Sequence, residues 1–176
     1  MQEAPVTFTD DTREIPLTRG QVAIVDAADY EWLSTFKWCA WRSRKTATWY
    51  AVRGLMRHEP GFVPPGATVL MHKAIMAPVP GMLVDHRDHN GLNNHRWNLR
   101  YATNAQNNMN QRSTRGTSHF LGVTWSLACS KWAAQIKVDG KHIHLGVFTS
   151  ETDAALARDE ASRRYFGEFA SLNFPH

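Results

Sequence analysis

A short stretch with almost no apolar side chains divides the chain and limits what each part can fold into. Residues 111–118 read Gln-Arg-Ser-Thr-Arg-Gly-Thr-Ser, a composition typical of a linker. Because the chain has 176 residues, each part is close to the smallest size that buries an adequate core. The sequence therefore predicts two small domains, residues 1–112 and 119–176, joined by a linker at 113–118.

The cysteine content and the apolar pattern exclude several classes of protein. The two cysteines, Cys39 and Cys129, form no CxxC pair, which argues against a structural zinc site and a disulfide framework. A single long-range disulfide stays open as the alternative. The first residues lack the basic start and apolar run of a signal peptide, and no stretch reaches the roughly 18 apolar residues of a membrane span. We expect a cytoplasmic protein, phage-encoded or in a bacterial host, without membrane contact.

Positive charge is concentrated in the middle of the chain. Residues 36–115 contain 12 basic and three acidic side chains, whereas residues 1–35 contain two basic and seven acidic ones. Residues 116–176 are balanced, with six of each. Since phosphate contacts supply most of the non-specific affinity for nucleic acid, a basic centre favours a polyanion partner, with a solvated basic face as an equal alternative.

Periodicity predicts a β-rich region before residue 80. A strand is predicted at Gln21–Val25, followed by a helix that Asp26 caps and that runs to Phe36. Two aromatic-rich runs, Lys37–Ser43 and Thr48–Arg53, predict a hairpin. The apolar spacing of Val69–Met76 predicts a second helix, which the following prolines end.

A polar loop between two short apolar runs predicts a compact unit of strand, loop, strand and helix. The strands are expected at Leu83–His86 and Leu99–Ala102, and the helix runs from Asn104 to about Gln111 behind the capping residue Thr103. This order predicts a ββα unit of about 30 residues.

The C-terminal part has the pattern of three strands and one helix. Strands are expected at Leu121–Leu127, Trp132–Val138 and His142–Phe148, and Asp139-Gly140 is a hairpin turn signal. Ser150 caps a helix that extends to about Gly167. Five side chains are expected to lie mostly in the core of this part: Trp125, Trp132, Phe148, Ala155 and Phe169.

The residues around the polar loop have the chemistry that phosphodiester hydrolysis needs. That reaction requires a base for water and a cation to stabilise negative charge, and hard divalent cations prefer oxygen ligands. Asp85 offers such a ligand and His86 a base. Further amide ligands are available on the predicted helix, at Asn104, Asn107, Asn108 and Asn110.

The segment from about Met71 to Asn110 resembles the HNH endonuclease family, of the kind encoded in phages and mobile introns. The resemblance is carried by Asp85-His86, Asn93-Asn94, Asn98-Leu99-Arg100 and Asn107. Twelve residues separate His86 from Asn98, and nine separate Asn98 from Asn107, as in the family.

The resemblance implies a role for each matched residue. His86 is expected to be the general base, and Asp85 and Asn107 to hold one Mg²⁺ or Mn²⁺, with Asn104 or Asn108 as alternatives to Asn107. Asn98 is expected to stay off the metal, tie the loop together and orient His86. Neighbouring residues of a regular strand point to opposite faces, so Asp85 and His86 are expected to need irregular backbone to share a site. Phosphate contacts are expected from Arg87, Arg96 and Arg100. For His72, packing or DNA contact is favoured over catalysis.

Residues from about His119 to Pro175 resemble the APETALA-type DNA-binding domain of plant ethylene-response factors. The matching pieces include Leu121-Gly122-Val123, Lys131-Trp132-Ala133-Ala134-Gln135-Ile136 and His144-Leu145-Gly146-Val147-Phe148. The resemblance implies that the sheet docks in the DNA major groove. Outward positions expected to contact DNA are Thr124, Ser126, Gln135, Lys137, His142 and His144. In the upstream hairpin, Arg42, Arg44 and Lys45 are candidates for phosphate contacts, with a structural role equally favoured.

Together these expectations describe an α+β protein. A ββα-metal HNH nuclease core at about 71–112, with an N-terminal β-rich extension, would be followed by a three-stranded antiparallel sheet packed on one helix. The expected function is a site-specific, metal-dependent endonuclease of the homing type acting on double-stranded DNA. One active site per chain favours a monomer that nicks one strand, and a dimer is the alternative for a paired cut. The rival hypothesis is a DNA-binding regulator with a vestigial HNH fold that does not cleave.

Overall fold

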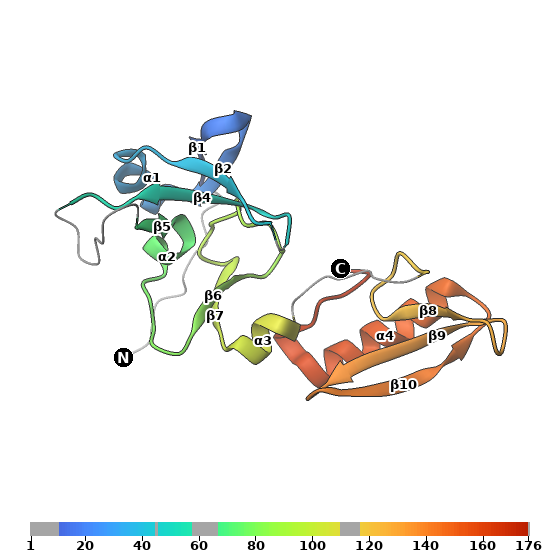
Figure 1. Ribbon diagram of the computed structural model, residues 1–176. Helices are drawn as coiled ribbons and strands as arrows, with labels where there is room; N and C mark the ends of the chain where they lie inside the picture. Colours follow the sequence, from blue (N-terminus) through green and yellow to red (C-terminus); the bar gives the residue numbers. More distant parts are fainter. Residues whose placement is uncertain (1–10, 45, 58–66, 110–116, 176) are drawn as a thin grey trace. The chain divides into compact units, whose positions relative to one another are not determined.

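The computed structural model describes residues 11–44, 46–57, 67–109 and 117–175 and divides the chain into two compact units, 1–102 and 103–176 (Figure 1). All strand pairs within its sheets are antiparallel, and helices accompany them in both units, so the architecture is mixed α and β. No helix in these described ranges is both long and apolar enough to cross a membrane.

The first unit begins with a hairpin and a helix. Strands β1 (Thr12–Pro16) and β2 (Val22–Asp26) pair, and α1 (Ala27–Ser34) follows directly. The predicted strand is confirmed, but the helix ends before Phe36. Asp26 precedes the helix as predicted, yet its side chain makes no capping hydrogen bond. The Asp26 carboxylate is used elsewhere, in the site described below.

The predicted aromatic hairpin is confirmed as β3 (Cys39–Arg42) and β4 (Trp49–Gly54). The segment predicted as one helix is a short strand, β5 (Thr68–Leu70), followed by α2 (Met71–Ile75). The prediction of helix at residue 69 is wrong because this β-branched segment pairs with β4, and a tertiary ladder outweighs the local apolar spacing.

The two predicted strands around the polar loop are confirmed. Strand β6 (Leu83–His86) pairs in regular register with β7 (Leu99–Ala102). These strands share one core with the upstream elements, which brings the polar loop against the N-terminal hairpin. The members of this core are Ile15, Ala23, Val25, Leu33, Trp38, Ala51, Met71, Ile75, Leu92 and Leu99.

The second unit opens with a short helix, α3 (Asn104–Met109). Thr103 caps it as predicted: its hydroxyl accepts a hydrogen bond from the Gln106 backbone N–H at 3.2 Å. The Gln106 side-chain oxygen accepts a hydrogen bond from the Thr103 backbone N–H at 2.8 Å, which completes a reciprocal capping box.

The three-stranded sheet and its helix are confirmed. Strands β8 (Val123–Ser126), β9 (Lys131–Val138) and β10 (Lys141–Phe148) form the sheet, and α4 (Glu151–Phe166) lies along one face of it, as Figure 1 shows. A short 3₁₀ turn, η2 (Gly167–Phe169), follows α4. At the predicted turn, Asp139 and Gly140 both have positive φ, as a type I′ hairpin requires.

Small side chains let α4 approach the sheet closely. Ala154 and Ala155 are fully buried against Val123 and Ala134, with Trp132 and Phe148 packed around them. Trp125, predicted as core, is 38% exposed instead. Its ring lies edge-on to Trp132 at 5.1 Å, at the margin of the sheet and outside the buried cluster.

A buried carboxylate fixes the end of the second unit. Asp159 on α4 is fully buried and accepts hydrogen bonds from the backbone N–H groups of Asn173 and Phe174 at 2.8–2.9 Å. The last residue of the linker predicted at 113–118 belongs to the packed part of this unit. Ser118 is buried and donates a hydrogen bond to Glu151 at 2.7 Å, and residues 113–116 lie outside the described ranges.

Candidate active site

His86 lies at the end of β6, buried among side chains from three other segments of the first unit. It is 6% exposed, and its ring centroid is 4.9 Å from that of His72 on α2 and 5.9 Å from that of Tyr50 on β4. Its Nε2 atom is 3.3 Å from Oδ1 of Asn94, a residue of the polar loop with no exposed surface.

The hydrogen bond to Asn94 decides which nitrogen of His86 can act as a base. An amide oxygen is only an acceptor, so Nε2 must carry the proton and donate it. In the neutral imidazole the remaining nitrogen, Nδ1, is then the basic one. Burial lowers the pKa of His86 below its ordinary value, opposed by the Asn94 hydrogen bond and by the charges of Asp88 and Asp85. At neutral pH this side chain is therefore a neutral, oriented base.

His72 is a neutral packing partner for His86. It is 5% exposed, and burial, aided by His86 and Lys73, lowers its pKa to about 3. Packing or DNA contact was expected for His72, and its burial between Tyr50 and His86 is what a packing role requires.

Asp85 forms a buried ion pair across the β6–β7 ladder. Its Oδ2 atom accepts hydrogen bonds from Nη2 of Arg100 at 2.9 Å and from Nε at 3.0 Å, and both residues are less than one-tenth exposed. Arg100 was predicted as a phosphate contact, whereas its burial and its two bonds to Asp85 favour a positioning role. Asp85 and His86 stand in regular register opposite Arg100 and Leu99, so the irregular backbone expected there is absent. The negative charge of Asp85 still acts on His86, where it opposes the lowering of the pKa that burial causes.

Asn98 ties the polar loop together. Its Nδ2 atom donates to Oδ1 of Asp88 at 2.9 Å and to the backbone oxygen of Asn93 at 2.8 Å, and its Oδ1 accepts the Asp88 backbone N–H at 3.1 Å. Asp88 in turn accepts a bond from Nδ2 of Asn93 at 2.7 Å. The loop therefore has a closed set of internal hydrogen bonds, with Asn98 at its centre and fully buried.

The N-terminal hairpin holds the same loop from outside. The Ile24 backbone N–H donates to the Leu92 carbonyl at 2.8 Å, and the Asn94 N–H donates to the Ile24 carbonyl at 2.7 Å. The Asp26 carboxylate lies 2.8 Å from Nδ1 of His95 and accepts the Arg96 backbone N–H at 2.7 Å. The β-rich extension thus fixes the loop that supplies Asn94 to His86.

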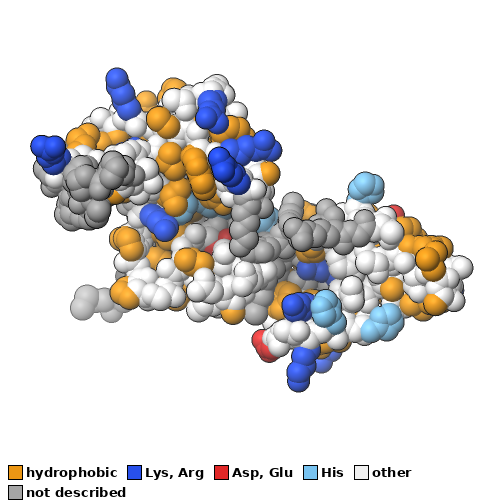
Figure 2. All heavy atoms as spheres, viewed as in Figure 1, with side chains coloured by type: hydrophobic (Ala, Val, Ile, Leu, Met, Phe, Trp, Pro, Cys, Tyr) orange, Lys and Arg blue, Asp and Glu red, His pale blue; other side chains and the backbone are white. Residues whose placement is uncertain are grey.

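The remaining predicted phosphate contacts of the first unit differ in how they are held. Arg87 and Arg44 are exposed, and Arg42 lies over the Trp49 ring at 5.9 Å. Arg96 makes two 2.7 Å bonds to Asp29, which together with the charges of Asp29 and Asp26 raise its pKa against the opposing effect of burial, and about half of its side chain stays exposed. Lys45 lies outside the described residues. Figure 2 shows Lys and Arg side chains spread around hydrophobic ones on the viewed face of this unit.

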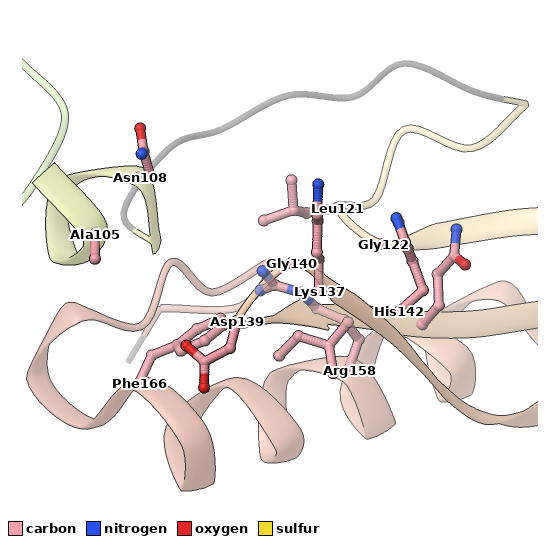
Figure 3. A pocket seen from close by; sticks show the side chains of 12 residues that line it. Ala105, Asn108, Leu121, Gly122, Lys137, Asp139, Gly140, His142, Arg158 and Phe166 are labelled. Atoms are coloured by element: carbon pink, nitrogen blue, oxygen red, sulfur yellow. The ribbon is translucent and has the colours of Figure 1, made fainter.

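The predicted DNA contacts of the second unit lie on the face of the sheet away from α4, as strand alternation requires. Lys137, His142 and His144 are exposed, and the other three, Thr124, Ser126 and Gln135, are half-buried. A hollow of about 630 Å³ in this unit is lined by Gln135, Lys137 and His142 together with Arg158 and Asn108 (Figure 3). This hollow, which also has the apolar side chains of Leu121, Ile136 and Phe166 in its lining, lies in the second unit and does not contain His86.

The residues present fit a hard divalent cation better than a thiophilic one. Asp85 supplies a buried carboxylate next to His86 in the first unit. The amides predicted as further ligands lie on α3 in the second unit, where Asn107 is half-buried and Asn104 and Asn108 are exposed. Among the described residues, no three His, Cys, Asp or Glu side chains converge. A metal at Asp85 would therefore need amide and water oxygens as further ligands, the donor set of Mg²⁺ or Mn²⁺.

Two parts of the site were missed by sequence reasoning. Asn94 was noted only as part of a motif, although it is the residue that contacts His86. Tyr50 was noted only as one of the aromatic residues of a hairpin, although its ring contacts both His72 and His86. The aromatic content of that hairpin was the available signal.

Comparison with known proteins agrees with this site. A family model described as HNH endonuclease matches residues 74–109. The chain is 34% identical over 90 residues to the uncharacterized HNH endonuclease L560 of Acanthamoeba polyphaga mimivirus, 51% of this chain and 46% of that protein. It is 32% identical over 79 residues to protein 3.8 of Escherichia phage T7, 44% of this chain and 65% of that one.

A second group of relatives comes from plants. APETALA2-like protein 2 of Oryza sativa subsp. indica is 42% identical over 62 residues, which is 34% of this chain and 14% of the relative. The chain spans less than two thirds of the length of each of these three relatives. The chain thus combines a segment similar to HNH endonucleases with a segment similar to APETALA2-like proteins.

Proposed function

We propose that the protein is a site-specific, metal-dependent endonuclease of the homing type that hydrolyses a phosphodiester of double-stranded DNA with His86 as general base. The observation that carries this proposal is the buried, neutral imidazole whose Nε2 atom is held by Asn94. A histidine needed only for packing would not require a buried amide, here that of Asn94, to fix which of its ring nitrogens carries the proton.

In the proposed reaction Nδ1 of His86 takes a proton from a water molecule as that water attacks the phosphorus atom. The P–O bond to the leaving 3′ oxygen then breaks, and a proton from solvent neutralises that oxygen. Asp85 and Asn107 would hold one Mg²⁺ or Mn²⁺, which supplies a positive charge for the phosphate as negative charge develops on it. Asn104 and Asn108 remain the alternatives to Asn107, and strands β6 and β7 with α3 would form a ββα-metal unit.

The residues around His86 would act by positioning. Arg100 fixes the direction of the Asp85 carboxylate, and Asn98 keeps the loop closed so that Asn94 reaches His86. The predicted domains, a nuclease of residues 1–112 and a DNA-binding module of residues 119–176, would divide cutting from targeting. The outward face of the β8–β9–β10 sheet would contact the major groove, and Arg87, Arg42 and Arg44 would contact phosphates.

One active site per chain supports nicking by a monomer, and a paired cut would require a dimer. The relative in phage T7 supports a site of action in the cytoplasm of a bacterial host.

The test is cleavage of supercoiled plasmid or phage DNA with Mg²⁺ or Mn²⁺ against EDTA, for the wild type and His86→Ala. The expected result is metal-dependent open-circle product that the variant does not form, while its salt-sensitive DNA binding stays intact. Equal cleavage by His86→Ala would reject His86 as the base. A variant that ends at Arg115 should lose site selection more than cutting, and unchanged selection would reject the targeting role of the second module.

A specific observation favours one alternative, a DNA-binding regulator that does not cleave. Nε and Nη2 of Arg100 both donate to Oδ2 of Asp85, so the carboxylate is already charge-balanced within the protein. If no DNA is cut with either metal although binding is retained, the regulator is the better description.

A further inference from the structure

A row of aromatic rings leads from the surface of the first unit to His86. Trp41 on β3 and Tyr50 on β4 are directly paired across the ladder, with ring centroids 6.1 Å apart and planes inclined by 37°. The Tyr50 ring is 5.9 Å from that of His86 and 5.7 Å from that of His72. The indole of Trp41 is thus one ring away from the proposed base.

The outer end of this row is not needed for the hydrophobic core. Trp41 is 49% exposed, and neither Trp41 nor Tyr50 belongs to the core cluster or to the side chains packed against it. By contrast, Trp38 and Trp49 of the same hairpin do pack with that core. A half-exposed indole whose row of rings continues through Tyr50 to the proposed base can stack on a ligand that has a flat apolar face.

The charge around the rings indicates which ligand that is. Lys73 and Arg87 are exposed and directly follow His72 and His86, and Arg44 is exposed in the turn that follows β3. An apolar platform on segments that also carry exposed cations suits a molecule with a flat apolar face on an anionic backbone. A nucleobase with its phosphates has both properties, whereas an apolar protein segment has only the first.

We propose that Trp41 and Tyr50 form a stacking subsite for an unpaired nucleobase next to the scissile phosphate, an inference that rests on the proposed nuclease function. Both faces of a base are covered inside a regular duplex, so an indole can stack on one only where a base step is opened or the base has left the helix. The enzyme would therefore act on DNA that is locally melted or kinked at the cut. Because every base has a π face, this subsite would add affinity for unpaired DNA with little sequence preference.

The test compares binding of two oligonucleotides to the full-length protein in EDTA, where cleavage does not interfere. One is a paired duplex, and the other has the same sequence with a three-nucleotide bubble that contains 2-aminopurine. Because the second module can contact both oligonucleotides equally, its contribution to affinity cancels in the ratio of the two Kd values. The wild type should bind the bubble about ten-fold more tightly and change the 2-aminopurine fluorescence, within the range known for base–aromatic stacking.

Three variants separate stacking from general effects. Trp41→Leu keeps apolar bulk without a π face and should lose most of the preference, whereas Trp41→Phe should keep most of it. The matched control is Trp97→Leu, because Trp97 is similarly exposed at 52% in the same unit but stacks on His95 and not on Tyr50. The proposal is overturned if Trp41→Leu keeps the wild-type Kd ratio, or if Trp97→Leu loses as much.

Cleavage of the same substrates distinguishes failure of this subsite from failure of the proposed function. If DNA is cut but the bubble gives no advantage that depends on Trp41, the subsite is rejected and the nuclease stands. If no DNA is cut but the binding preference disappears in Trp41→Leu, the subsite is supported and the hydrolytic function is rejected. His86→Ala should abolish cutting and keep the binding preference.

Discussion

The Nε2 atom of His86 and the Oδ1 atom of Asn94 lie 3.3 Å apart inside the first unit, and this contact joins the strand with the proposed base to the polar loop. Asn94 also donates from Nδ2 to the Leu92 carbonyl at 3.1 Å, so its amide orientation is fixed from both ends. The tautomer of His86 is therefore determined by a residue eight positions further along the chain.

Asn94→Ala should reduce cleavage strongly and DNA binding little. Without the acceptor at Nε2, neither the tautomer nor the ring orientation of His86 is selected, and we expect a roughly 10- to 100-fold loss of kcat, typical of losing such a supporting partner. The measurement is single-turnover cleavage beside a Kd from electrophoretic mobility shift. Asn94→Asp retains an acceptor and should recover part of the rate. Full activity of Asn94→Ala would show that Asn94 does not position the base.

Gly91 allows the polar loop to lie against the aromatic hairpin. A Cβ atom at this position would be 2.4 Å from the Trp49 carbonyl oxygen and 2.6 Å from the Tyr50 ring. Gly91→Ala should therefore displace the loop and lower the free energy of unfolding by about 1–3 kcal/mol, the usual cost of overpacking. Gly54→Ala is the matched control, since a Cβ there meets nothing within 4 Å. Equal thermal midpoints for the two variants would contradict this account.

Arg100 and Arg96 both pair with aspartates, but only Arg100 is buried with its partner. Arg100→Ala leaves the Asp85 carboxylate unpaired away from water and should destabilise the protein by about 3–5 kcal/mol. Arg96→Ala removes a half-exposed guanidinium that water can replace, and the buried Asp29 carboxylate keeps its hydrogen bond from the Trp32 indole, so the cost should be smaller, about 1 kcal/mol. Urea denaturation of both variants measures the difference, and a larger effect of Arg96→Ala would reverse the assignment.

Strand alternation and turn residues were enough to predict the hairpins and short strand pairs. The aromatic hairpin, the β6–β7 pair and the C-terminal sheet follow from alternation and turn residues, as the positive φ angles of Asp139 and Gly140 illustrate. Asp26 shows where this reasoning ends. Its position favours a helix cap, yet its carboxylate bonds to His95, 69 residues away. A local sequence pattern cannot predict a hydrogen-bond partner so far along the chain, because this contact depends on how β2 packs against the polar loop.

The candidate site was predictable in its residue types and not in their contacts. Asp85, His86 and Asn98 were identified from their spacing, whereas the aromatic row from Trp41 to His86 depends on the register of β3 on β4. Trp125 illustrates the same limit in the second unit. Its strand alternation predicts burial, but the side chain lies outside the buried cluster on edge strand β8 and stays 38% exposed.

The two neutral histidines should make the protein less stable in mild acid. In the folded chain His72 keeps its neutral form down to a pKa of about 3, whereas in the unfolded chain it takes up a proton near its ordinary value of 6.5. Between these values the unfolded state binds more protons, so stability must fall as the pH decreases from about 6.5 toward 3. Burial lowers the pKa of His86 as well, and its contribution has the same sign. The measurement is the urea midpoint of unfolding at a series of pH values from 8 to 4. His72→Leu removes one of the two groups and should flatten the acid limb, and an unchanged slope in that variant would mean that His72 is protonated in the folded protein.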